Sequence, residues 1–471
     1  MKKIVTRYAT IANDISSQIS AGVLLAGERI PSVRAYSRTR GFSSNTVLRA
    51  YHLLEDRGEI AARARSGYYV LGAPAKPAAD ASAPIRSKAA NAEDLAFEVF
   101  ETTRLRNLVH FGHAWPSAQL YPLKRLARAF NASARGMVDE ALPPYYPREN
   151  SELIRHIARR SLQWGFTGKA EEVVLTAGAL EALNLCLRAV TRPGDLVAIE
   201  SATLYGVRSA LQRFALRPIE IATDPRDGVS LSALSTALRK HRIRACVFMP
   251  TFQHPLGSLM PEEKKRELVR MLASRDIPLI EDDVCGELYF GETRPKPAKA
   301  FDRKGLVLHC SSFSKSLAPG YAVGWALPGK FTRAVHRGKW TSNTLSGIST
   351  QGAVLEFIEY GGYELHLRRL RRTLAALQKH CVQTVLRFFP AGTTVTRPQG
   401  GYVAWVELPK GVSAVALYRS ALENKITIAP GIIFSGDARY ANCFRLNYGQ
   451  VWSPRLDEAL HLLGGIASSL V

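Results

Sequence analysis

The sequence has few features that would place the protein in a membrane, in an oxidising compartment or around a metal ion. It contains no run of about 18 consecutive apolar residues, which excludes a membrane-spanning helix. Its six cysteines are scattered, with no C-x-x-C pair and no histidine at a ligand spacing, which predicts reduced thiols and no metal site. The N-terminal segment MKKIVTRYATIAND lacks the apolar core of a secretory signal peptide. We therefore expect a cytoplasmic protein without membrane contacts.

Acidic residues are also in deficit. There are 40 Asp and Glu against 63 Lys and Arg, a formal net charge of +23, in a chain that is 46% hydrophobic and 22% charged. That composition is typical of a soluble globular protein. The positive charge favours a polyanionic partner, with nucleic acid as the leading candidate, although a solvated basic surface would give the same count.

Large apolar side chains are almost missing from one internal stretch. Residues 72–92, GAPAKPAADASAPIRSKAANA, are rich in Ala and Pro and cannot bury enough surface to offset the entropy lost on ordering. We assign a linker to residues 72–104. It separates a small domain, residues 1–71, from a large domain, residues 105–471.

The small domain shows the element order of a winged helix-turn-helix. Apolar spacing predicts a helix over residues 8–22, Ser32 begins a short helix that ends at Gly41, and a longer helix covers residues 43–58. A hairpin is predicted around Ser66 and Gly67. Residues 1–71 hold 11 Lys and Arg against 5 Asp and Glu, a net charge of +6, which fits phosphate contacts. A three-helix structural module with one polar face is the alternative.

The front of the second helix of the pair would read bases in the major groove. The candidate reading residues are Ser43, Ser44, Asn45, Thr46 and Arg49.

These elements resemble the N-terminal domain of GntR-type bacterial regulators. The resemblance lies in GERIPSVRAYSRTRGFSSNTVLRAYHLLEDRG followed by RSGYYV, and it covers nearly the whole small domain. It implies that Arg34, Thr46 and the wing glycine Gly67 contact double-stranded operator DNA. The family often has arginine where this chain has Ser44, so one familiar contact is missing.

The large domain alternates strand-like and helical segments. The predicted strands are residues 173–178, 196–201, 245–250, 277–282 and 306–310. Such alternation predicts an α/β domain whose mainly parallel sheet is covered on both faces. Ligands in these sheets bind at the carboxyl ends of strands.

Several chemically useful residues follow these strands. Lys315 lies just after 306–310, and a partly desolvated lysine forms a Schiff base with an aldehyde. As a lone residue it would more often be a solvated surface lysine. It also completes an S-x-x-K motif with Ser312, but the K-T-G motif that accompanies S-x-x-K in penicillin-binding proteins is absent. Asp282 ends the strand at 277–282, where a carboxylate either caps a helix or keeps a pyridine nitrogen protonated.

Other candidates are weaker when taken one at a time. Gly178 lies at a strand-to-helix turn, where free N–H groups and the helix dipole favour phosphate. Tyr205 could stack on a flat ring or belong to ordinary packing. Arg445 could bind a substrate carboxylate or pair with a structural one.

Taken in order, the motifs of residues 110–465 resemble fold-type I aminotransferases, which use pyridoxal 5'-phosphate. The matching blocks are HFGHAWPSAQLYP, LTAGALEALNL, PTFQHPLG, IEDDVCGELYF, SSFSKSLAPGYAVGW, IAPGIIFS and FRLNYG. Fusion to a GntR-type domain is the layout of the MocR subgroup of regulators. The resemblance implies that Lys315 attaches the cofactor, Asp282 pairs with its ring nitrogen, Tyr205 stacks on the ring, and Arg445 binds the carboxylate of an amino-acid-like ligand. The implied phosphate contacts are Gly178, Ala179, Leu180, Ser312 and Ser314.

Three positions depart from the aminotransferase pattern. His254 stands where the family usually has an asparagine that bonds the phenolic oxygen of the cofactor, and Cys285 replaces a tyrosine that bonds the same oxygen. Ala322 replaces the phosphate-binding arginine of the family. A histidine still donates a hydrogen bond, a cysteine donates a weak one, and an alanine side chain donates none.

These observations predict a dimeric DNA-binding transcriptional regulator. Its aminotransferase-like domain would bind pyridoxal phosphate through Lys315 and sense either the cofactor or an amino-acid-like effector. One alternative is an active aminotransferase that carries a DNA-binding module. The other is a regulator whose large domain no longer binds the cofactor.

Overall fold

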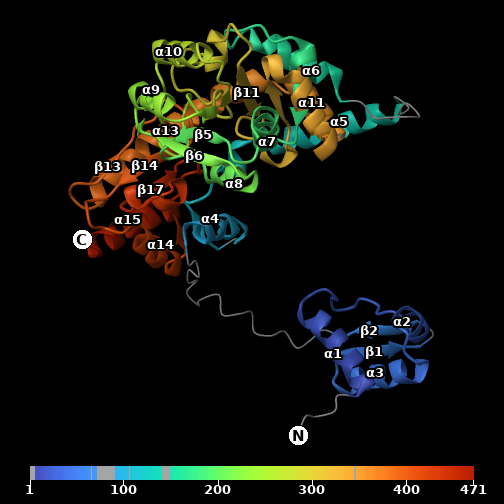
Figure 1. The fold of residues 1–471 in the computed structure, drawn as a ribbon. Helices are drawn as coiled ribbons and strands as arrows, with labels where there is room; N and C mark the ends of the chain where they lie inside the picture. Colours follow the sequence, from blue (N-terminus) through green and yellow to red (C-terminus); the bar gives the residue numbers. More distant parts are fainter. Residues whose placement is uncertain (1–5, 65, 72–90, 106, 140–148, 344–345) are drawn as a thin grey trace. The chain divides into compact units, whose positions relative to one another are not determined.

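The computed structural model describes residues 6–64, 66–71, 91–105, 107–139, 149–343 and 346–471. The chain divides into two compact units, residues 1–83 and 84–471, which are described separately (Figure 1). No helix in the described part of the chain is long and apolar enough to cross a membrane. The same residues contain no group of three or more His, Cys, Asp or Glu side chains suited to a metal ion.

The small unit has the predicted helix, helix-turn-helix and wing. Its elements are α1 Arg7–Ser20, α2 Val33–Arg40, α3 Ser44–Asp56, β1 Ile60–Arg63 and β2 Gly67–Val70. The side chains of Ser32 and Ser43 cap α2 and α3 as predicted, and Gly41 ends α2 in the left-handed conformation. Strands β1 and β2 pair antiparallel. Val47 and Leu54 of α3 are fully buried against α1 and the wing.

The large unit is built on a seven-stranded sheet in the order β4, β12, β11, β10, β9, β5, β6. All pairs are parallel except those of β12, which runs antiparallel to β11 and β4. The strands are β4 Val174–Thr176, β5 Leu196–Glu200, β6 Arg217–Ile221, β9 Ile243–Phe248, β10 Leu279–Asp282, β11 Val307–Ser312 and β12 Gly324–Leu327. The five predicted strands are thus confirmed as β4, β5, β9, β10 and β11.

Helices cover both faces of this sheet because its buried strands are apolar on both sides (Figure 1). One face packs against α7 and α8, and the other packs against α9 and α10. The helices outside the C-terminal region are α5 Leu123–Asp139, α6 Ser151–Ser161, α7 Ala179–Val190, α8 Tyr205–Arg213, α9 Leu231–Lys240, α10 Glu262–Ala273, α11 Thr332–Ser342 and α12 Ile348–Tyr360.

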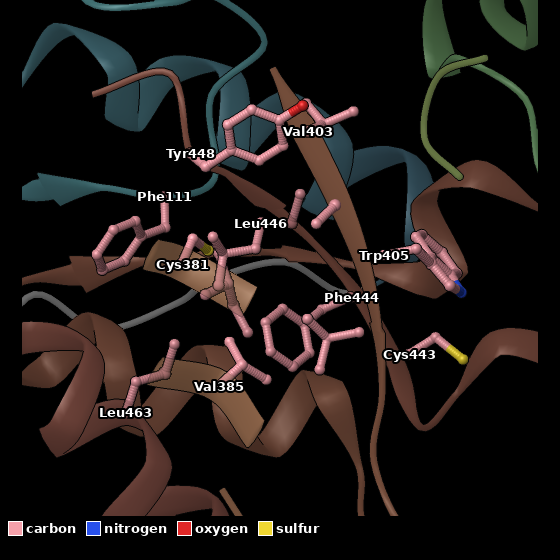
Figure 2. Packing of buried hydrophobic residues seen from close by; sticks show 14 of the residues in the cluster. Phe111, Cys381, Val385, Val403, Trp405, Cys443, Phe444, Leu446, Tyr448 and Leu463 are labelled. Carbon is pink, nitrogen blue, oxygen red and sulfur yellow. The ribbon is translucent and has the colours of Figure 1, made fainter. Parts of the chain in front are cut away.

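The C-terminal region folds around a second, four-stranded sheet in the order β13, β14, β17, β16. Its core packs the central strands against the long helix α13 and against α15, and Figure 2 shows Phe444 from β17 beside Val385 from α13. The elements of this region are α13 Tyr363–Phe388, β13 Thr394–Val395, β14 Val403–Glu407, α14 Ala414–Glu423, β16 Ala429–Pro430, β17 Cys443–Asn447 and α15 Pro454–Ser469. Two-residue strands complete the unit: β3 Val109–His110, β7 Thr223–Asp224, β8 Gly228–Val229 and β15 Ile426–Thr427.

The linker assigned to residues 72–104 needs a correction at its C-terminal end. Residues Ala92–Glu101 form helix α4, capped by the Asn91 side chain, and Leu95 and Val99 are buried in the core of the C-terminal region. The Ala- and Pro-rich composition ends before AEDLAFEVF, where Leu95, Ala96 and Val99 recur at helical spacing. Residues 72–90 lie outside the described part of the chain.

Candidate cofactor site and DNA-reading surface

Lys315 lies three residues beyond β11, at the carboxyl edge of the sheet. Its Nζ donates to the carbonyl oxygen of Ala114 at 2.7 Å and lies 4.6 Å from the centre of the Trp115 ring. Burial lowers the pKa of the lysine to about 7, although the nearby Cys285 and Asp282 act in the opposite direction. A large fraction of the amine is therefore uncharged at neutral pH, and the uncharged amine is the form that attacks an aldehyde.

Asp282 ends the neighbouring strand β10, so it reaches the same edge. Its Oδ1 accepts a hydrogen bond from the backbone N–H of Val284 at 3.1 Å. Desolvation raises the pKa of this carboxyl to about 6, while the Val284 bond and the charge of Lys315 lower it. At neutral pH the carboxylate form dominates, and that form suits a protonated pyridine nitrogen.

The turn before α7 forms a cradle of backbone N–H groups. Gly178 adopts φ +99° ahead of the helix, and no side chain caps the first turn. The cradle lies tight against β12, because a Cβ on Gly324 would stand 2.5 Å from the carbonyl carbon of Gly178. The N–H groups of Ala179 and Leu180 belong to the helix end that has no intrahelical partners. The arrangement suits a phosphate group.

Ser312 ends β11, and Ala322 lies two residues before β12, so the two flank Lys315 in the sequence. Ser312 is buried, and its Oγ accepts from the backbone N–H of Ser314 at 3.3 Å. Ala322 is exposed and takes the left-handed conformation, with φ +50°. The left-handed backbone at position 322 already carries a Cβ, so a longer side chain can replace alanine without a change of backbone conformation.

Arg445, on β17, is fully buried in the centre of the large unit. It donates hydrogen bonds to Nε2 of His254 and to the carbonyl oxygen of Gly112, and its guanidinium lies 5.3 Å from the centre of the Phe434 ring. Within the described residues, no carboxylate forms an ion pair with Arg445 and its Nε has no hydrogen-bond partner. A buried cation without a counter-charge is costly, so this position favours an anionic ligand.

His254 contacts the guanidinium of Arg445. Burial, and then the charge of Arg445, hold the pKa of His254 well below its usual range. The neutral ring accepts from Arg445 through Nε2, which leaves the proton on Nδ1. Tyr205 begins α8, with its ring 6.4 Å from that of Phe434, the aromatic neighbour of Arg445. Cys285 is buried, which raises the pKa of its thiol.

The residues at this edge fit pyridoxal phosphate. Lys315 would provide an amine for the aldehyde, Asp282 a carboxylate for the ring nitrogen, and the turn at Gly178 a cradle for the phosphate. Arg445 would supply the cation for a ligand carboxylate. When bound, the cofactor would supply an electron sink for the chemistry of an amino acid.

Sequence reasoning missed the loop that covers Lys315. Asn447 Nδ2 donates to the carbonyl oxygens of His113 and Trp115, at 3.0 and 2.7 Å. Tyr402 Oη donates to the carbonyl of Ala114 at 2.8 Å. The aromatic Trp115 in the matching block HFGHAWPSAQLYP was the one sign in the sequence that this loop belongs to the site. The residues that hold the loop, Tyr402 and Asn447, lie about 300 positions away, so sequence spacing could not identify them.

The predicted DNA-reading residues gather at the start of α3. The hydroxyls of Ser43 and Thr46 lie 2.7 Å apart, and Ser43 Oγ also accepts from the Thr46 N–H, so this pair fixes the helix start. Ser44, Asn45 and Arg49 are exposed. The Arg49 guanidinium lies 5.3 Å from the centre of the Tyr8 ring, which orients the side chain against α1.

Arg34 and the wing complete this surface. Arg34 is exposed on the first turn of α2. Gly67 has φ +109°, and a Cβ there would come within 3.1 Å of the Arg29 side chain, which packs beside the wing. Arg63 stacks on Tyr69 with 4.3 Å between its guanidinium and the ring centre. Arg29 and Arg63 are additional cationic residues that motif comparison did not select.

Replacing Arg34 by alanine is expected to weaken operator binding by about 1–3 kcal/mol, because a bidentate arginine contact to a base contributes about that much. Gel-shift titration of the promoter region of the protein's own gene measures the change. Arg57→Ala is the matched control, since Arg57 contacts Asn13 at the far end of α3. Binding by Arg34→Ala as tight as that of the parent would remove Arg34 from the reading surface.

Comparisons with known proteins agree with both units. Residues 7–70 match the bacterial regulatory proteins of the gntR family, and residues 116–463 match aminotransferase class I and II. The chain is 39% identical to the HTH-type transcriptional regulator YdcR of Escherichia coli strain K12, over 97% of this chain and 98% of that protein. It is 24% identical to the probable rhizopine catabolism regulatory protein MocR of Rhizobium meliloti, over 90% and 86% of the two chains.

A solved structure shows the same fold for the large unit. The α-aminoadipate aminotransferase LysN from Thermus thermophilus, complexed with N-(5'-phosphopyridoxyl)-L-leucine, matches with a TM-score of 0.73 and 28% identity, over 79% of this chain and 95% of that one. The fold is therefore that of aminotransferase fold-type I, preceded by a GntR-type winged helix. The chain belongs to the MocR subgroup of GntR-type transcriptional regulators, in which a winged-helix domain is fused to an aminotransferase-like domain.

Proposed function

We propose that this regulator is a cytoplasmic homodimer that holds pyridoxal phosphate on Lys315 and senses the cofactor or an amino-acid-like effector. The buried guanidinium of Arg445 is the observation that carries the proposal. It has no ion-pair partner among the described residues and lies in the same unit as a lysine whose pKa is about 7. The guanidinium suits the carboxylate of an amino-acid-like ligand, and the uncharged Lys315 amine suits the aldehyde of the cofactor.

The departures from the aminotransferase pattern support sensing over turnover. A neutral His254 accepts from Arg445, and Cys285 offers only a buried thiol. Both positions would otherwise hold donors for the phenolic oxygen of the cofactor, and such donors adjust its electronics. The site thus keeps the groups that bind, while position 285 offers only a weak donor and the Nε2 of His254 is already used by Arg445.

One experiment separates the two functions. The cofactor-loaded protein is titrated with amino acids, and we record its absorption spectrum, its affinity for operator DNA and the formation of keto acid. For a sensor we expect one amino acid to shift the spectrum and change DNA affinity without sustained product. Multiple turnovers with a keto-acid acceptor would establish an active aminotransferase instead. A loaded protein that responds to no carboxylate ligand would contradict the role of Arg445.

A further inference from the structure

The amino edge of the central sheet, opposite the edge that holds Lys315, carries a dense group of basic side chains. A pocket of about 620 Å³ there is lined by Arg192, Arg242, Arg244 and Arg275, together with His241. These four arginines are all exposed. They come from loops that precede β5 and β10 and from the start of β9, so the parallel topology brings them together.

The basic character continues along the same edge on both sides of the pocket. Arg217 begins β6, while Arg303 and Lys304 precede β11, and all three are exposed. Two carboxylates line the pocket. Asp195 accepts from the backbone N–H of Arg192, and Asp276 pairs with Lys304 at 3.2 Å. Among the described residues, the ion pairs leave Arg192, Arg242, Arg244 and Arg275 without a carboxylate partner.

Helix ends account for only part of this charge. Arg188 and Arg213 lie in the last turns of α7 and α8, where cations complement the helix dipole. Arg242 directly follows the C-cap of α9, and Arg275 donates to the carbonyl oxygen of Met271 in the last turn of α10, so both also complement helix ends. Arg217 begins β6 and Arg244 lies within β9, so the dipole does not explain these two. Arg244 is anchored by a hydrogen bond from its Nε to the carbonyl oxygen of Val190 at 3.1 Å, which holds its guanidinium at the edge.

We propose that this amino edge is a second DNA-binding surface, which contacts the phosphate backbone of duplex DNA flanking the operator. The edge runs across β11, β10, β9, β5 and β6. At about 4.8 Å between strands it is about 19 Å long. Duplex DNA presents one phosphate charge per about 1.7 Å of axis, so such a length faces about 11 charges. A contact with the phosphate backbone carries no direct sequence information.

The test compares DNA lengths with the full-length protein. Binding is measured over a range of salt concentrations on a short duplex that holds only the operator, and on a long duplex extended by about three helical turns on each side. The double variant Arg242→Ala/Arg275→Ala is compared with Arg368→Ala/Arg369→Ala, which removes the same charge from exposed positions on α13.

On the long duplex, the edge variant is expected to lose about 1–2 from the slope of log affinity against log salt, because each lost phosphate contact changes the slope by about 0.9. On the short duplex it should bind like the parent, which also shows that operator reading is intact. The control variant should match the parent on both. An unchanged slope on the long duplex, or an equal loss on both duplexes, would overturn the proposal.

A small phosphorylated ligand offers the same chemistry as the DNA backbone. Thermal melting with added inorganic pyrophosphate distinguishes the two sources. Stabilisation of the parent, absent from the edge variant and accompanied by an unchanged long-duplex slope, would assign the pocket to a small anion and overturn the DNA assignment.

Discussion

Lys315→Ala is expected to abolish covalent retention of pyridoxal phosphate. The visible absorption band that develops when the parent protein meets the cofactor should be absent from the variant at every cofactor concentration. Lys315 is the amine at the carboxyl edge of the sheet, and its lowered pKa makes it reactive at neutral pH. For the parent, the rate of band formation should increase as the pH rises through about 7, since protonation below that value removes the nucleophile.

Lys330→Ala is the control, because Lys330 is exposed and lies in the same unit beyond β12. It should develop the parent band. Equal bands in Lys315→Ala and the parent would show attachment elsewhere. A parent protein that never develops the band would support the alternative of a cofactor-free domain that serves dimerisation.

Ala322→Arg is expected to tighten cofactor binding by about 10- to 100-fold. A charge-assisted hydrogen bond to phosphate contributes roughly 1.5–3 kcal/mol, which converts to that range. The backbone at position 322 is already left-handed and already carries a Cβ, so the longer arginine side chain adds no backbone strain. Titration of the apo-protein with pyridoxal phosphate, followed by absorbance, measures the effect.

Ala322→Gln separates charge from size, because glutamine extends a donor without a positive charge. We expect it to bind the cofactor nearly as weakly as the parent. No gain with arginine would mean that another cation already meets the phosphate. The weak binding that we expect of the parent would let occupancy follow the cellular level of the cofactor, as a sensor requires.

Much of the fold was predictable because its signals are local. The caps Ser32 and Ser43 and the apolar strands act within a few residues, and the structure confirms them. Strand β6 was missed because it is a polar edge strand, RPIEI, whose proline is tolerated only where one side lacks a partner. Strand β12 was missed because it lies in the motif SSFSKSLAPGYAVGW, which we interpreted only for its lysine and serines. The chain reverses direction there, and β12 runs antiparallel to β11.

The candidate site was predictable where residues follow strands, as Lys315 and Asp282 do. The pairing of Arg445 with His254 joins side chains 191 positions apart, and no periodicity reports such a contact. The same holds for Asn447 and the loop at 113–115. The order of the motifs identified each of these residues separately. Only the folded chain shows that His254 accepts a hydrogen bond from Arg445.

Helix α4 changes where the two units can be cut apart. Leu95 and Val99 are 2% and 3% exposed, and burial of such a side chain contributes about 1.5–3 kcal/mol. A large unit expressed from residue 105 would lose this helix and uncover the apolar surface beneath it. A fragment designed to keep this core therefore begins no later than Asn91, and a gene fusion that respects the fold places its junction upstream of that residue.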